Sequence, residues 1–388
     1  MASLNLNKVS PIQVEVIEHI SSLNADDWNS CVGANAPFAR HEFLSSLEDS
    51  QCVQPKNGWM AHHLVIKGDD GKIKACAPMY LKSHSYGEYV FDWSWAEAYD
   101  RAGGRYYPKL QSAIPFTPVT GPRFLLHPSA SPEDRNALIT AMIKRAIDLK
   151  VSSLHVTFST REEWDILKNH GFLQRTGHQY HWDNRDYDDF DVFLNQLTSR
   201  KRKAIRKERK AVSESGVELI TLSGNDITDL HWDAFYSFYM DTSGRKWGHA
   251  YLNREFFSLL GQRMGQSIIL VLAQMDGRIV AGALNIKGDE TLYGRYWGCL
   301  EDFRFLHFEA CYYQAIDYAI THKLKRVEAG AQGQHKIQRG YLPVETYSAH
   351  WFADNGFANA VKDFLEHDKR VNDHEMTELS TLSPYKKA

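Results

Sequence analysis

Two stretches of this chain share a pattern that predicts a β-hairpin. In each, an apolar run (residues 63–66 and 268–273) meets an Asp-Gly pair, and a second apolar run follows. The pairs are Asp70-Gly71 and Asp276-Gly277. Glycine accepts the positive φ of a tight turn without steric cost, so Asp-Gly between apolar runs is a strong hairpin signal. The chain is therefore expected to build an antiparallel sheet in each half.

The segments that follow the two hairpins also repeat. The tripeptide Ala-Ile-Asp occurs in helical patterns at 146–148 and 315–317, and a short strand pattern follows each, at 154–158 and 326–329. A hairpin, a helix and a strand in the same order twice indicate a duplicated α/β domain. The alternative is coincidence, because Asp-Gly turns and amphipathic helices are common.

A duplication fits the length of 388 residues, which suggests two or three domains. We expect an N-terminal domain over 1–183 with an aromatic insertion at 86–122. A C-terminal domain over 184–388 would begin with a basic helix at 190–214. The last residues, 379–388, carry no clear pattern and are expected to fray.

Composition excludes several classes of protein. The net charge is −3 with 24% charged residues, so a charged partner must be met locally. Five scattered cysteines without a CxxC pair argue against a disulfide scaffold or a cysteine zinc site, and we expect no metal. No signal pattern and no apolar run of about 18 residues is found, which predicts a cytoplasmic protein without membrane insertion.

The order of elements and several local strings resemble a known family. A strand, two helices, a hairpin, a helix, a strand, a helix and a strand resemble the GNAT acyltransferase fold, here in tandem. Tandem GNAT domains with a basic helix resemble the Fem aminoacyl transferases, and most of all the bacterial Fem-like family labelled peptidoglycan biosynthesis or recognition, predicted N-acyltransferases. The strings that carry the resemblance lie at 89–93, 104–110, 115–123, 307–313 and 328–336.

This resemblance implies both a fold and an activity. The fold class would be α/β with a mixed (α+β) sheet in two tandem GNAT-like domains. The activity would be transfer of an acyl or aminoacyl group from an activated ester or thioester to an amine, on a cell-wall precursor or related metabolite. The donor would be acyl-CoA or aminoacyl-tRNA, and the partners a small-molecule amine acceptor and tRNA. The Arg/Gln-x-x-Gly-x-Gly/Ala turn that cradles acetyl-CoA is absent near 128–136 and 298–310, which speaks against acetyl-CoA.

A dense basic run at 199–210 is the first candidate binding segment. Eight of its twelve residues are Lys or Arg, on a segment whose apolar residues have helical spacing. One face can dock while the other presents a positive field suited to phosphates. A solvated helix face is the alternative. The phosphate-binding candidates here are Arg200, Arg202, Lys203 and Arg206.

A glycine-rich segment at 328–340 is the second candidate. It leaves a strand pattern and carries Glu328, Gln332, His335, Lys336 and Arg339 among three glycines. Ligands bind at strand ends in open α/β sheets, and glycines let backbone N–H groups approach a carbonyl or phosphate. A polar loop with cap glycines is the alternative. We assign Lys336, helped by Arg339, to oxyanion or phosphate stabilisation.

His307 and Glu309 precede a helical pattern and form the third candidate. A histidine beside a carboxylate suits removal of a proton from an attacking amine, so we assign this pair to proton handling, with Glu328 as a further catalytic candidate. Equally, Glu309 can simply complement the helix dipole, with His307 as a neighbour of the cap.

The aromatic segment within 86–123 is the last candidate. It has no counterpart in the second half, so we expect it to form a ligand wall between the domains, with an Ω-loop as the alternative. The binding candidates here are Asp92, Trp93, Lys109 and Arg123, with Tyr296 from the strand pattern at 291–297. A rival function is a noncatalytic protein that binds a phosphate-bearing ligand, a cell-wall precursor or nucleic acid, between the domains. That function would need the cations and aromatics but not His307, Glu309 or Glu328.

Overall fold

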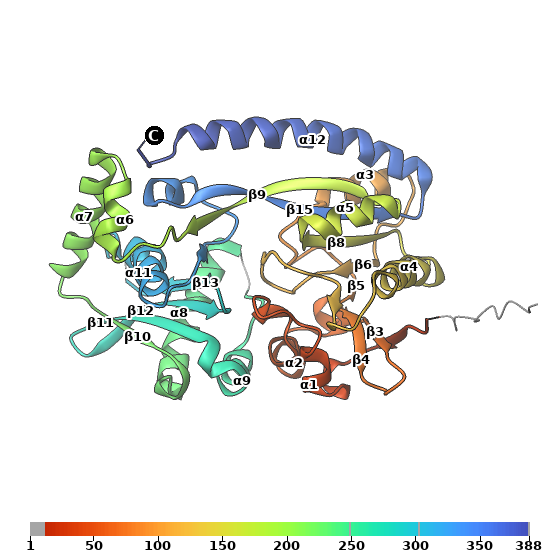
Figure 1. Cartoon of the computed structure of the whole chain (residues 1–388), viewed down its shortest axis with the longest axis horizontal. Coiled ribbons are helices and arrows are strands. Elements are labelled where there is room, and N and C mark those ends of the chain that lie inside the picture. Colours follow the sequence, from red (N-terminus) through yellow and green to blue (C-terminus); the bar gives the residue numbers. More distant parts are fainter. Residues whose placement is uncertain (1–11, 248–249, 302, 387–388) are drawn as a thin grey trace, which may run out of the picture.

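The computed structural model describes residues 12–247, 250–301 and 303–386. One sheet of eleven strands runs through both halves of the chain in the order β10-β11-β12-β13-β14-β9-β15-β8-β6-β5-β2 (Figure 1). A smaller sheet in the N-terminal half has the order β1-β3-β4-β7. Helices pack against these sheets, which gives a mixed α/β architecture.

The N-terminal half supplies nine strands and five α-helices. Its strands are β1 (Glu15–Ile17), β2 (Trp59–Ala61), β3 (His63–Lys67), β4 (Ile73–Ala77), β5 (Tyr80–Lys82), β6 (Lys109–Ser112), β7 (Leu125–Leu126), β8 (Ser153–Ser159) and β9 (Leu173–Asp183). Its helices are α1 (Ala25–Asn29), α2 (His41–Asp49), α3 (Trp93–Arg101), α4 (Pro132–Asp148) and α5 (Arg161–Asn169).

The C-terminal half contains the remaining elements. Its strands are β10 (Glu218–Leu222), β11 (Ile268–Met275), β12 (Arg278–Lys287), β13 (Thr291–Cys299), β14 (Arg326–Glu328) and β15 (Leu342–Phe352). Its helices are α6 (Phe190–Gln196), α7 (Ser199–Ser213), α8 (Asp229–Trp247), α9 (Arg254–Met264), α10 (Leu306–Phe308), the π-helical turn η6 (Glu309–Tyr313), α11 (Gln314–Thr321), the 3₁₀ segment η7 (Gln334–Arg339) and α12 (Asn355–Thr381).

The two sides of the large sheet have similar pairing. Antiparallel strands lead to β13 on one side (β10, β11 and β12) and to β6 on the other (β2 and β5), and β13 and β6 each pair in parallel with the next strand, β14 or β8. At the centre β9 pairs with β14 and β15, while β15 also pairs with β8. Each half therefore sends its last strand into the sheet of the other half. The predicted fold class, two tandem GNAT-like domains with a mixed sheet, is confirmed.

Both predicted hairpins form. The first is β3–β4, and Gly71 in its turn has φ +78°. The second is β11–β12, where Met275 pairs with Arg278 across a two-residue turn. Asp276 and Gly277 in that turn both have positive φ, 52° and 75°. Two central residues with positive φ match the twist of the flanking strands, which explains the Asp-Gly sequence.

Two expectations about local structure need correction. The segment 86–122 is not wholly unmatched, because it contains β6, which occupies the position in the sheet that β13 occupies in the other half. The segment 379–386, which was expected to fray, is ordered: α12 continues to Thr381, and Tyr385 forms a β-bridge with Leu197. Residues 387–388 lie outside the described residues.

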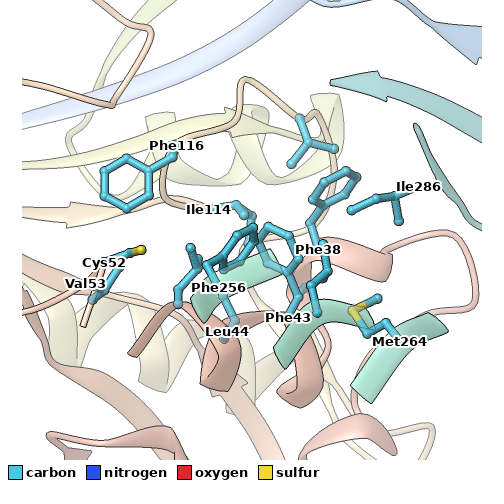
Figure 2. Packing of buried hydrophobic residues seen from close by; sticks show 14 of the residues in the cluster. Phe38, Phe43, Leu44, Cys52, Val53, Ile114, Phe116, Phe256, Met264 and Ile286 are labelled. Atoms are coloured by element: carbon cyan, nitrogen blue, oxygen red, sulfur yellow. The ribbon is translucent and has the colours of Figure 1, made fainter. Parts of the chain in front are cut away.

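A shared hydrophobic core joins the two halves. Phe38 and Phe43 near the N-terminus pack with Phe256 and Met264 of α9 and Ile286 of β12 (Figure 2). Burying large aromatic side chains across this junction fixes the position of one half against the other.

Helix α12 spans the centre of the molecule on the opposite side of that junction. It packs against β9 and β15, the two strands that are exchanged between the halves (Figure 1). Across the ranges described above, the structure contains no helix with the length and apolarity needed to cross a bilayer.

Candidate functional site

A large cavity lies where two parallel strands part. β13 and β14 pair only from Thr291 to Tyr293, after which β14 ends and β13 continues. The cavity has a volume of about 1020 Å³ and is lined on one side by residues 294–297 of β13 and on the other by 329–333 after β14. A strand end that opens between neighbours is a usual ligand position in α/β sheets.

A β-bulge shapes the β13 wall of the cavity. Leu284 of β12 pairs with Tyr296 and Asn285 pairs with Gly294, so Arg295 is the extra residue. Bulges leave a residue out of the ladder and bend the strand, and they are common next to active sites. The bulge therefore turns β13 away from β14 where the cavity begins.

Both halves contribute to the cavity walls. The N-terminal half supplies residues 89–91 and residues 175–178 of β9, and α12 adds Asp368, Asn372 and Glu375. The cavity therefore depends on the strand exchange, since β9 comes from the first half and the facing turn from the second.

Two histidines and a tyrosine gather on the wall formed by α10, η6 and η7. The Tyr312 hydroxyl lies 2.9 Å from Nε2 of His335. The His307 ring is 5.3 Å from the Tyr312 ring and 6.0 Å from the His335 ring, measured between centroids. All three side chains line the cavity. Of the predicted site residues, His307 and His335 are thus brought together, and Tyr312 is a neighbour that the sequence analysis did not select.

Glu309 is not the partner of His307. Its Oε1 accepts hydrogen bonds from Arg209 Nη2 at 3.1 Å and from Gln314 Nε2 at 2.9 Å, and the residue is buried. The structure therefore places Glu309 in an ion pair that attaches α7 to the π-helical turn. The predicted pairing of His307 with Glu309 is wrong, because an arginine from another helix takes the carboxylate.

Lys336 stabilises the glycine-rich turn by hydrogen bonds to its backbone carbonyls. Its Nζ donates to the carbonyl oxygens of Ala329 at 2.6 Å and Gly330 at 3.2 Å, and the side chain is buried. Gly330 and Gly333 have φ values of +77° and +106°, a region that side chains rarely adopt. The turn is thus shaped by glycine and pinned by a lysine that also lines the cavity. Gln332 lines it as well, from an exposed position.

Glu328 is buried at the end of β14, just behind the cavity lining. Its Oε1 accepts a hydrogen bond from Thr120 at 3.3 Å, and its Oε2 lies 3.7 Å from Arg295 Nη2 and 3.9 Å from His181 Nε2. Burial raises the pKa of Glu328 and lowers the pKa of His181 to about 3. Arg295 and His181 were missed because nothing in their own sequence context distinguishes them from ordinary strand residues.

The single basic helix expected over 190–214 is divided into α6 and α7, because Leu197 between them is extended; the basic run lies in α7, which docks through a few of its residues. Ile205 and Val212 are buried, and Glu208 accepts two hydrogen bonds from Arg339, at 2.8 and 3.0 Å. Arg339 also lies over the Phe308 ring at 3.4 Å. Arg339 therefore has a structural position between η7 and α7 and does not line the cavity.

The other cations of α7 face outward. Arg200 and Lys203 are exposed, Arg206 pairs with Asp191 at 2.7 Å, and Arg202 donates to Asn195 at 3.3 Å. None of the four candidates lines the cavity. They form a positive surface on the helix that Glu208 and Arg209 fasten to the cavity wall.

Two candidates of the aromatic segment, Lys109 and Asp92, belong to a buried network. Lys109 Nζ forms an ion pair with Asp92, lies 2.7 Å from Glu88 Oε2 and donates to Ser85 Oγ at 2.7 Å. Burial alone would lower the pKa of Lys109, but Glu88 and Asp92 raise it above its ordinary value. Neither Lys109 nor Asp92 lines the cavity. The expectation that they contact substrate there is corrected, since they satisfy one another inside the N-terminal half.

Arg123 is likewise a structural residue. Its guanidinium donates to the backbone carbonyls of Val119, Gly121, Pro122 and Thr157. It therefore holds a loop in place and is not available to a substrate. The remaining two candidates, Tyr296 and Trp93, each line a cavity.

Tyr296 lines the large cavity and donates to the Phe116 carbonyl at 3.0 Å. Trp93 lines a second, smaller cavity.

Comparisons with known proteins agree with this architecture. The sequence model of the FemAB-like family, described as peptidoglycan biosynthesis/recognition, matches residues 19–387. Comparison with curated proteins gives no match. Among solved structures, the crystal structure of FemX is similar with a TM-score of 0.55 and 13% identity, covering 90% of this chain and all of that chain.

Two further structures have comparable folds. One is the C-terminal domain of a putative lysylphosphatidylglycerol synthetase from Agrobacterium fabrum, with a TM-score of 0.56, 9% identity, and coverage of 89% of this chain and 97% of that chain. Another is a protein of unknown function from Bacteroides thetaiotaomicron, with a TM-score of 0.50, 12% identity, and coverage of 87% and 99%. At these identities the likeness concerns the fold alone. The family match spans nearly the whole sequence, and the chain belongs to the FemAB-like family.

Proposed function

We propose that this protein is an N-acyltransferase that moves an acyl or aminoacyl group from an activated ester or thioester to the amine of an acceptor. The observation that supports it best is the cavity between β13 and β14, with His307, Tyr312 and His335 on one wall and the turn 329–333 on another. The description of its family suggests a cell-wall precursor as the acceptor, and the lysylphosphatidylglycerol synthetase similarity offers a lipid as another.

The proposed reaction needs a base and a site for negative charge. As the amine nitrogen bonds to the donor carbonyl carbon, its proton passes to an imidazole, for which His307 and His335 are the candidates. The carbonyl oxygen becomes an oxyanion, which backbone N–H groups and the Lys336 ammonium stabilise. The oxyanion then re-forms the carbonyl as the C–O or C–S bond to the donor breaks, and the leaving alkoxide or thiolate takes up the proton from the imidazolium.

Lys336 is the residue whose removal tests the glycine-rich turn. Lys336→Ala is expected to lower kcat by on the order of a hundredfold with little change in KM, because an interaction made mainly in the transition state is lost. Steady-state kinetics with the true donor and acceptor measure this. Lys336→Gln keeps a donor for the Ala329 carbonyl but carries no charge, so recovery of activity in this variant would assign Lys336 to positioning of the turn.

The control for Lys336 is Lys325, which is exposed and pairs with Glu290 far from the cavity lining. Lys325→Ala should behave like the parent. Equal activity of Lys336→Ala and the parent would remove the turn from the proposed site.

The exposed cations of α7 are proposed to bind the phosphates of the donor. Replacing Arg200, Lys203 and Lys207 with alanine is expected to weaken tRNA binding and to lower the slope of log K against log salt by about 2, since each phosphate contact releases condensed counterions. Thermal unfolding should hardly change, because the three side chains are exposed. Fluorescence anisotropy of labelled tRNA at several salt concentrations measures the slope.

A triple variant on α12 is the matched control for charge. Lys362, Lys369 and Arg370 are also exposed cations on one helix, but they lie on α12. If their replacement lowers the salt slope as much as the α7 triple variant does, binding is a property of net charge and not of α7.

The rival function is a noncatalytic protein that binds a phosphate-bearing ligand. The α7 cations lie on an outer surface and do not line the cavity, and this position supports the binding function as a second candidate. This protein would bind tRNA or a nucleotide-linked precursor through α7, and His307→Ala would leave that binding unchanged.

A further inference from the structure

A second cavity of about 300 Å³ adjoins the large one. Five aromatic side chains line it, together with Ser85 and Gly87, and we call it the aromatic pocket. The aromatic residues are Tyr86, Tyr89, Phe91, Trp93 and Tyr251. Three of them, Tyr89, Phe91 and Tyr251, also line the large cavity. A ligand bound in the large cavity can therefore extend one of its groups into the aromatic pocket.

Ser85 and two backbone carbonyls of the pocket lining already have hydrogen-bond partners in the protein. The Ser85 hydroxyl accepts a hydrogen bond from Lys109 at 2.7 Å. The carbonyl of Tyr86 accepts one from Trp59 Nε1 at 3.2 Å, and the carbonyl of Gly87 accepts one from a backbone N–H at 3.2 Å. A ligand therefore meets mainly aromatic side chains, three of which are tyrosines.

Several of these aromatic side chains are unusually exposed. The exposed fractions of Tyr86, Phe91 and Trp93 are 46%, 52% and 36%. Clustered exposed aromatic surface of this kind marks binding sites, because water leaves it when a ligand covers it. The Tyr86 and Trp93 rings lie edge to face with centroids 4.8 Å apart, so two of the aromatic side chains already contact each other.

The shape of the backbone beside the pocket is fixed. Gly87 has φ +81°, and a Cβ at this position would lie 2.6 Å from the Phe116 ring. Only glycine fits there, so the loop that carries Tyr86 and Tyr89 packs tightly on Phe116. A pocket formed before binding loses little conformational entropy when it is filled.

We propose that the aromatic pocket binds a planar aromatic ring of the substrate, and specifically the adenine of the donor. The inference rests on the proposed function, because adenine is the ring shared by the two donor classes, coenzyme A and the 3′ end of tRNA. A planar ring is favoured over a sugar because five of the seven lining residues are aromatic and present faces on which a ring can stack.

The test is binding of adenosine to the full chain, measured by isothermal titration calorimetry with ribose as the comparison. Stacking on an aromatic side chain is worth about 1–3 kcal/mol per base, so Trp93→Ala should raise the Kd of adenosine by about tenfold. Phe91→Ala should act in the same direction. Phe364→Ala removes an exposed aromatic side chain of α12 outside the pocket, with an exposed fraction of 39%, and should bind adenosine like the parent.

Two results would overturn the inference: adenosine affinity that is unchanged in both Trp93→Ala and Phe91→Ala, or ribose that binds as well as adenosine. If adenosine binding fails while turnover still depends on His307, the pocket assignment is wrong and the proposed function stands. If adenosine binds through Trp93 but no acyl transfer occurs, the pocket assignment stands and the proposed function is wrong. Competition by coenzyme A, set against competition by an oligonucleotide ending in 3′-CCA, identifies which donor carries the adenine.

Discussion

Replacement of Lys109 with alanine is expected to lower the free energy of unfolding by about 3–5 kcal/mol. Lys109 is fully buried and its ammonium lies between the carboxylates of Glu88 and Asp92. Its removal leaves two buried carboxylates, and the remaining cation, Lys82, reaches only Glu88, at 3.6 Å. Burial lowers the pKa of Lys82 to about 7 in the parent protein, which shows that a charged ammonium at that position is costly. Chemical denaturation of the purified variant measures the loss.

The comparison for this variant is an exposed ion pair. Lys67 and Glu15 lie 2.8 Å apart with side chains 39% and 37% exposed, and Lys67→Ala should cost less than about 1 kcal/mol. The original expectation for Lys109 was contact with substrate. A Lys109→Ala protein with parental stability and weakened donor or acceptor binding would restore that expectation and refute the structural role.

The local elements of the fold could be predicted because their signals lie within a few residues. The Asp-Gly turns predicted the two hairpins, and the Ala-Ile-Asp segments correctly fell in α4 and α11. Hydrophobic period and turn residues act over short distances, so the sequence carries them directly. The basic run predicted α7 for the same reason.

The exchange of β9 and β15 could not be read in the same way. Their alternating patterns predict strands, but the choice of partner depends on contacts between residues far apart in the sequence, such as Leu342 with His181. Helix α12 was missed although Asp354 caps it and its buried residues Val361 and Leu365 are four apart. That spacing was available in the sequence, and its many charged neighbours obscured it.

For the candidate site, the sequence predicted which segments lie at the cavity better than it predicted which side chains bond to one another. The glycine-rich turn and His307 lie at the cavity, as a strand end followed by glycines suggested. The partner of Glu309 could not be predicted, because Arg209 reaches it from a helix a hundred residues earlier. In the same way, the sequence showed that Lys109 and Arg123 are cations but not that burial would turn them inward.

His307→Ala is expected to lower kcat by about 10²–10⁴-fold, the usual contribution of a positioned general base. The reason is its place on the cavity wall beside Tyr312, which in turn bonds to His335. KM should change little, since the imidazole acts on the proton that leaves as the amine attacks. Steady-state rates across pH 5–9 measure the effect, and the variant should lose the limb of the profile that falls in the range of histidine titration.

Two further variants decide whether the three side chains act together. If His307 and His335 work through Tyr312 as one unit, His307→Ala combined with His335→Ala should cost little more than the larger single loss, because coupled residues are not additive. Tyr312→Phe keeps the ring and removes the hydroxyl that contacts His335, so it isolates that hydrogen bond. His322→Ala is the matched control, since His322 is an exposed histidine at the end of α11 outside the cavity lining. If the fold losses in kcat of the two single variants multiply in the double variant, the histidines have separate tasks. If His307→Ala has parental activity, His307 is excluded as the base and the binding-protein function is favoured.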